Sequence, residues 1–75
     1  MRAVLTVIGK DHVGILSKVA NKCAECNANI IEVTQTVLQD LFCMIMMIDI
    51  SSVNCELSEL VYQMNQLGEK AGLSI

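Results

Sequence analysis

The stretch that decides the fold is Gly9-Lys10-Asp11-His12-Val13-Gly14-Ile15-Leu16, because the chain changes its periodicity there. Residues 3–8 before it form an apolar run typical of a buried strand, and after it apolar residues recur at helical spacing. The stretch therefore predicts a strand-to-helix crossover, where backbone N–H groups at the helix start point outward. We expect Gly9 to end the strand, Asp11 to cap the helix, and Gly14 to permit close approach of a backbone or a ligand.

The segments on either side of this crossover predict a central strand and an amphipathic helix. Residues 2–9 are aliphatic and β-branched without clear alternation, as in a strand buried on both faces. The helix is predicted to end near Asn27, a residue that tolerates the left-handed conformation found at helix ends. Its apolar stripe consists of Ile15, Leu16, Val19, Ala20 and Cys23.

A short connection at 27–29 precedes two further strands. Residues 30–39 alternate apolar and polar side chains, which indicates a half-buried edge strand with Ile31, Val33 and Val37 on one side. Gln39-Asp40 is predicted as a tight turn. Residues 41–50 are nearly all apolar and predict a second central strand, paired with the edge strand as a hairpin.

The last third of the chain predicts a second helix and a short extended segment. After a loop at 51–54, the helix is expected from about Cys55 to Ala71, with Gly72 as its C-terminal stop. Residues 73–75 begin an extended segment. The helix has an apolar stripe made of Leu57, Leu60, Val61, Met64, Leu67 and Ala71.

The order of elements is therefore βαββαβ with a truncated last strand. This order predicts an α+β, ferredoxin-like fold in a single domain, residues 1–75. Its sheet is antiparallel, with the first and third strands in the centre and both helices on one face.

Two helices leave the other face of the sheet uncovered, although the third strand is apolar on both sides. Cys43, Ile45 and Met47 alternate there with another apolar set, and one of the two must face away from the helices. Exposed apolar patches of that size mark interfaces. Since 53% of the 75 residues are hydrophobic, the chain is predicted to form a dimer or a larger oligomer.

Composition argues against several classes of partner. The net charge is −3, the five basic residues are scattered, and the aromatics are only Phe42 and Tyr62, so direct nucleic-acid binding is not expected. No apolar run approaches the roughly 18 residues of a membrane span. The N-terminus has no small-residue cleavage site, so we expect a cytoplasmic protein without a signal peptide.

Cys23 and Cys26 form the one CxxC pair and suggest an alternative function, a metal or redox carrier on the same fold. Such carriers place the pair in the loop before the first helix, where the helix N-terminus stabilises thiolates. Here the pair lies near the other end of the helix. We therefore expect reduced cysteines that act as packing residues, without a metal or cofactor.

Catalysis is not expected either. His12 has no Ser, Cys or carboxylate at a spacing that would form a dyad with it. An acylphosphatase-like enzyme, a third candidate on this fold, would require an Arg in the first loop to hold phosphate, and the loop offers only Lys10 and His12.

Residues 9–16, followed by Asn27-Ala28-Asn29-Ile30 and Thr34-Gln35-Thr36, resemble the ACT domain. The likeness covers residues 2–73 and is closest to small stand-alone bacterial ACT proteins similar to the glycine-cleavage-system repressor. It implies a regulatory module, without catalytic activity, that binds an amino acid between subunits and can act on a regulatory protein partner. The implied pocket joins the first loop of one subunit to the second strand of its neighbour, and its residues are Asp11, His12, Val13, Gly14, Asn29 and Ile30. From the residues alone, Asp11 is more simply a helix cap and Asn29 a turn residue.

Overall fold

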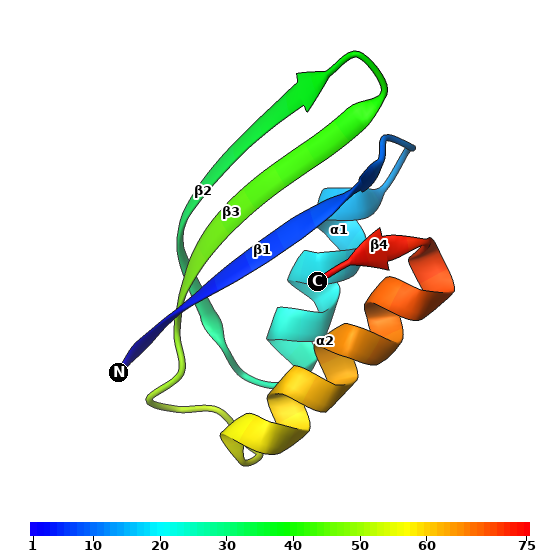
Figure 1. Ribbon diagram of the computed structural model, residues 1–75. Helices are drawn as coiled ribbons and strands as arrows, with labels where there is room; N and C mark the ends of the chain where they lie inside the picture. The colour runs from blue at the N-terminus through cyan, green and yellow to red at the C-terminus, as the bar shows by residue number, and fades with distance from the viewer.

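The two most apolar strands of the sequence lie at the centre of the sheet in a computed structural model that describes residues 1–75 (Figure 1). The strand order is β2-β3-β1-β4, with β2 and β4 at the edges and all pairs antiparallel. This confirms the predicted ferredoxin-like arrangement. The elements are β1 (Arg2–Lys10), α1 (Ile15–Glu25), β2 (Asn29–Leu38), β3 (Leu41–Asp49), α2 (Leu57–Ala71) and β4 (Leu73–Ser74).

The core lies between the sheet and the two helices, which cover the same face (Figure 1). From β3 it takes Phe42, Met44, Met46 and Ile48, none more than 6% exposed. The alternating set faces away from the helices, and its central member, Ile45, is 55% exposed. One apolar set of this strand is therefore uncovered, as predicted. No helix in the structure has the length and apolar character that a membrane crossing requires.

The helices end where the sequence predicted, each followed by a residue with a left-handed backbone conformation. Asn27 has φ 59° after α1, and its backbone N–H donates to the carbonyl of Ala24 at 3.1 Å. Gly72 has φ 72° after α2, and its N–H donates to the carbonyl of Gly68. These bonds satisfy carbonyl groups that the last helical turn leaves free. At its other end α2 begins at Leu57, two residues later than predicted.

The predicted roles of Gly9 and Asp11 at the crossover were wrong. Asp11 does not cap α1, because the residue before the helix is Gly14 and no side chain makes a capping bond. Gly9 does not end β1, which continues to Lys10; a Cβ at Gly9 would lie 2.6 Å from the side chain of Leu73, so the glycine makes room for β4. Gly14 adopts a left-handed backbone conformation, with φ 89°, and a Cβ there would meet no atom of this chain closer than 3.7 Å, so close approach of a ligand at Gly14 stays a prediction.

The inner side of β2 also differs from the prediction. Ile30 pairs with Ile48 but Glu32 pairs with the next residue of β3, so Ile31 is the extra residue of a β-bulge. The bulge shifts the alternation, and Ile30 and Val33 pack against the core while Ile31 is 41% exposed. Placing Ile31 on the same side as Val33 was therefore wrong.

The apolar stripe of α2 is only partly buried. Leu60 and Met64 are in the core, and Gly68 replaces a side chain where the carbonyl of Leu73 passes. Leu57 and Val61, predicted in the same stripe, are each 51% exposed. The reason is the two-residue length of β4, which leaves no strand beneath this flank of the helix.

Candidate ligand-binding site

The loop Asp11–Gly14 connects β1 to α1 at one end of the sheet (Figure 1). Its backbone is attached to the β2–β3 turn, because the N–H of Asp11 donates to the carbonyl oxygen of Asp40 at 2.7 Å. Its other contact is with the end of α2, where Nε2 of His12 lies 3.2 Å from the carbonyl oxygen of Ala71. The loop is thus anchored to two segments that are distant in sequence.

The start of α1 has free donors facing this loop. No side chain caps the helix, its first turn contains no acidic residue, and the hydroxyl of Ser17 donates to the carbonyl of Gly14 at 3.1 Å rather than accepting from an N–H. Unsatisfied N–H groups and the helix dipole make such an end attractive to an anion. Beside it the side chain of Asp11 is exposed and that of Val13 is 97% exposed.

Asn29 and Ile30 lie at the opposite end of the sheet. Asn29 pairs with Asp49 of β3, which pairs with Arg2 at the start of β1, whereas the loop follows Lys10 at the end of β1. Ile30 is half-buried against the core. The structure therefore brings together residues 11–14, but within one chain it separates them from Asn29 and Ile30 by the length of the sheet.

Asp49 is a polar residue of this second end that sequence reasoning missed. As direct cross-strand partners, Asn29 and Asp49 project from the same face, the one away from the helices. Asp49 Oδ1 accepts two hydrogen bonds from Ser51, one from its hydroxyl at 2.6 Å and one from its backbone N–H at 2.9 Å. These bonds hold the pKa of Asp49 below its usual range. The available signal was that Asp49 is the one acid in the apolar stretch 41–50.

Both cysteines of the CxxC pair are buried, Cys23 on the inner side of α1 and Cys26 at the end of the helix. Cys23 contacts the sulfur of Met46 at 3.9 Å, and the thiol of Cys26 donates to Gln63 Oε1 at 3.5 Å. Burial is the main cause that raises the pKa of both thiols, and the proximity of other cysteines adds to it. Both are therefore protonated at neutral pH, whereas metal binding and thiol exchange use the thiolate. The structure contains no group of three or more His, Cys, Asp or Glu side chains that could hold a metal ion.

Residues 2–75 match the family model of the ACT domain. This chain belongs to the ACT domain family. Curated relatives include a UPF0237 protein of Listeria innocua, 49% identical over all 75 residues, which are 84% of that protein. A UPF0237 protein of Methanopyrus kandleri is 42% identical over 99% of this chain and 82% of its own length.

Solved structures agree with this assignment. An ACT domain protein from Streptococcus pneumoniae superposes with a TM-score of 0.86 at 32% identity, covering 99% of this chain and 83% of that one. A putative glycine cleavage system transcriptional repressor gives a TM-score of 0.85 at 25% identity, with 97% of this ACT domain matching 42% of that chain. The sequence-based resemblance to the ACT domain and to such repressors is confirmed.

Proposed function

We propose that this ACT domain is a regulatory module that binds a small amino acid between two copies of the chain and acts through their interface. On this proposal residues 1–75 work as one cytoplasmic unit, without a cofactor and without catalysis, and a change in the dimer is read by a regulatory protein partner. The observation that carries the proposal is the uncapped start of α1 beside the exposed loop Asp11–Gly14. Membership of the ACT domain family supports it.

An amino acid matches the chemistry of the two ends of the sheet. Its carboxylate accepts from the free N–H groups at the start of α1. Its ammonium group requires oxygen acceptors, which Asp11 offers beside the loop and Asn29 and Asp49 offer at the other end. His12, Val13 and Ile30 complete the walls.

Because these two ends of the sheet lie apart within one chain, the proposed site requires a second copy whose strands run in the opposite direction to those of the first. An isologous dimer places the loop of each copy against the start of β2 of the other, and it contains two equal sites. The uncovered sheet face supplies apolar contact area for such a dimer, with Val4, Ile8, Leu38, Leu41 and Ile45 exposed on it.

The proposal is tested by thermal denaturation in the presence of each of the twenty amino acids. A ligand that binds only the folded form stabilises it by about 2.7 kcal/mol at one hundred times its Kd. For a domain of this size each kcal/mol shifts Tm by roughly 4–8 °C, so the right amino acid raises Tm by about ten degrees or more. Asn29→Ala reduces that shift, while Asn21→Ala, the same change at another exposed position, on α1, leaves it intact. If no amino acid produces a shift, the proposed function is wrong.

A further inference from the structure

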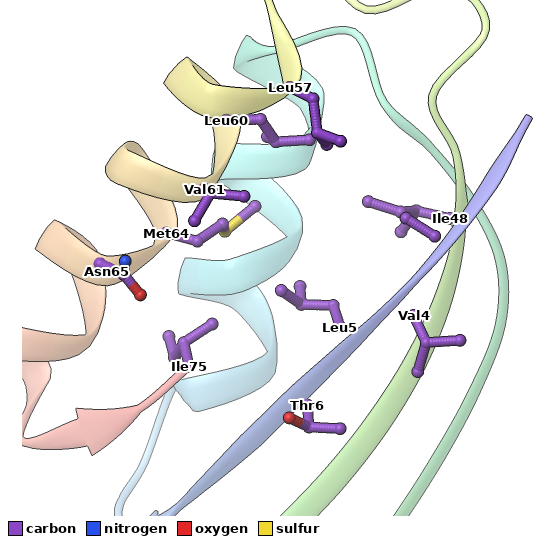
Figure 2. A pocket seen from close by; sticks show the side chains of 11 residues that line it. Val4, Leu5, Thr6, Ile48, Leu57, Leu60, Val61, Met64, Asn65 and Ile75 are labelled. Carbon is purple, nitrogen blue, oxygen red and sulfur yellow. The ribbon is translucent and has the colours of Figure 1, made fainter.

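The reactive side chains that the proposed function leaves unused are cysteines, and three of the four gather where α1 ends. The groove between β1 and α2 holds none of them, since its lining residues are apolar apart from Thr6 and Asn65 (Figure 2). Cys23 lies in the last turn of α1, Cys26 is the residue after the helix, and Cys55 lies in the loop before α2. A reaction that needs two neighbouring thiols is therefore confined to this junction.

Hydrogen bonds hold the loop before α2 against the end of α1. The backbone N–H of Asn54 donates to the carbonyl oxygen of Cys26 at 3.0 Å. The side-chain amide of the same Asn54 donates to the carbonyl oxygen of Glu25 at 2.8 Å. The next residue in the chain, Cys55, is therefore held beside Cys26.

The side chains of Cys26 and Cys55 meet at this junction. Their thiols are hydrogen-bonding partners, and the Cys26 thiol also donates to Gln63 Oε1 of α2 at 3.5 Å. Cys23 instead contacts the sulfur of Met46 in the core, at 3.9 Å. A disulfide needs backbones that lie close together and Cβ atoms that are directed toward each other. Adjacent backbones with thiols in mutual contact allow Cys26 and Cys55 to form one with little movement.

The thiols of this junction differ in their access to solvent. Cys26 is 2% exposed, whereas Cys55 is half-buried and can be reached by a small reagent. Oxidation can therefore begin at Cys55 and end at Cys26 without a reagent that enters the core. Cys23 is fully buried and closed to the first step.

We propose that Cys26 and Cys55 form a reversible disulfide when the chain meets a low-molecular-weight disulfide such as oxidised glutathione. Cys55 loses its proton, its thiolate attacks one sulfur of the reagent, and the reagent's S–S bond breaks to release one glutathione thiolate. Cys26 then loses its proton and attacks the Cys55 sulfur of the mixed disulfide, which releases the second glutathione. Two protein thiols are oxidised to one disulfide, and one small disulfide is reduced to two thiols.

The disulfide clamps the end of α1 to the loop before α2. It closes the part of the chain that contains β2 and β3, and a cross-link over a loop of that length restricts the unfolded chain. Oxidation therefore stabilises the folded chain, and a thiol reductant restores the lower stability of the reduced form. This clamp does not depend on the proposed amino-acid site.

The experiment incubates the reduced 75-residue chain with oxidised glutathione under native conditions at about pH 8, where thiolates form. Mass spectrometry should find a mass lower by two hydrogen atoms and no bound glutathione. Peptide mapping should place the bond between Cys26 and Cys55. Tm should rise by roughly ten degrees or more, and dithiothreitol should reverse the rise.

Matched variants separate this pair from the other thiols. Cys55→Ser removes the half-buried partner and should abolish both the disulfide and the rise in Tm. Cys43→Ser makes the same change at the half-buried cysteine of β3 and should leave both intact. Cys26→Ala should stop the reaction after its first step, with one glutathione attached to Cys55.

The proposal is overturned if the chain gains no disulfide, or if the bond joins Cys23 to Cys26 or joins two chains. It is also overturned if oxidation leaves Tm unchanged or lowers it. A rise in Tm that persists in Cys55→Ser, or that disappears in Cys43→Ser, contradicts it as well.

Discussion

Gly14 is the residue whose backbone sets the start of α1. Its φ of 89° lies in a region that side chains with a Cβ rarely adopt, although there is open space around it. We expect Gly14→Ala to lower the free energy of unfolding by about 1–2 kcal/mol and Gly14→Asn to lower it by less, since Asn tolerates the left-handed region. Urea denaturation measures both. Equal stability of the Ala variant and the parent chain would contradict this role.

The buried thiols of Cys23 and Cys26 predict a pH dependence of stability. Burial raises their pKa above the ordinary value of 9.0, so the folded chain keeps protons that the unfolded chain releases. The stabilisation is complete below pH 9 and is lost as the pH rises toward the folded pKa. Urea denaturation at about pH 8 and about pH 10 should show this fall. Cys23→Ala should reduce this fall in the free energy of unfolding. Val19→Ala, a core truncation that keeps both thiols, should retain it. An equal fall in the two variants would contradict the role of the buried thiols.

The structural roles of Asp11 and Asp49 could not be predicted from their residue type. Asp before an apolar-periodic segment is a common cap, but here Gly14 occupies the capping position and the carboxylate of Asp11 stays free. Asp49 lies directly opposite Asn29 on the neighbouring strand, and the register between β2 and β3 sets this pairing. The sequence therefore predicted the loop of the candidate site and Asn29 at its second end, while Asp49 was recognised only from the structure.

At the scale of elements, hydrophobic periodicity predicted every helix and strand in the correct order. It did not predict which residues are buried where that depends on a neighbouring element. The bulge at Ile31 adds one residue without a change in composition, so the alternation of β2 appeared continuous. The exposure of Leu57 and Val61 depends on how far β4 extends beneath α2, which the period of α2 does not encode.

The CxxC pair of α1 gives a prediction about metal. Since both thiols are buried and protonated at neutral pH, a chelator and a mild reductant should leave the melting curve unchanged. Native mass spectrometry should find no metal at stoichiometric level. A drop in Tm on chelation, or one zinc ion for each chain, would support the carrier function instead.

At the scale of the whole molecule, the uncovered face of the sheet predicts association. Ile45 lies at its centre and contributes to no core contact, so Ile45→Lys should fold normally but dissociate the dimer. Leu57→Lys, a similarly exposed position on α2, should leave the dimer intact. Light scattering of the parent chain and both variants decides this. A well-behaved monomer for the parent chain at all concentrations would rule the interface out.

Each proposed amino-acid site is built from two copies of the chain, and subunit complementation tests this arrangement. One copy carries Gly14→Val, which damages its loop, and the other carries Asn29→Ala, which damages the start of its β2. In their mixed dimer one site has both defects and the other has none. Calorimetric titration with the amino acid that gave the largest Tm shift should therefore detect one intact site in each mixed dimer and weakened binding in either variant alone. Failure of the mixture to recover any binding would contradict a shared site.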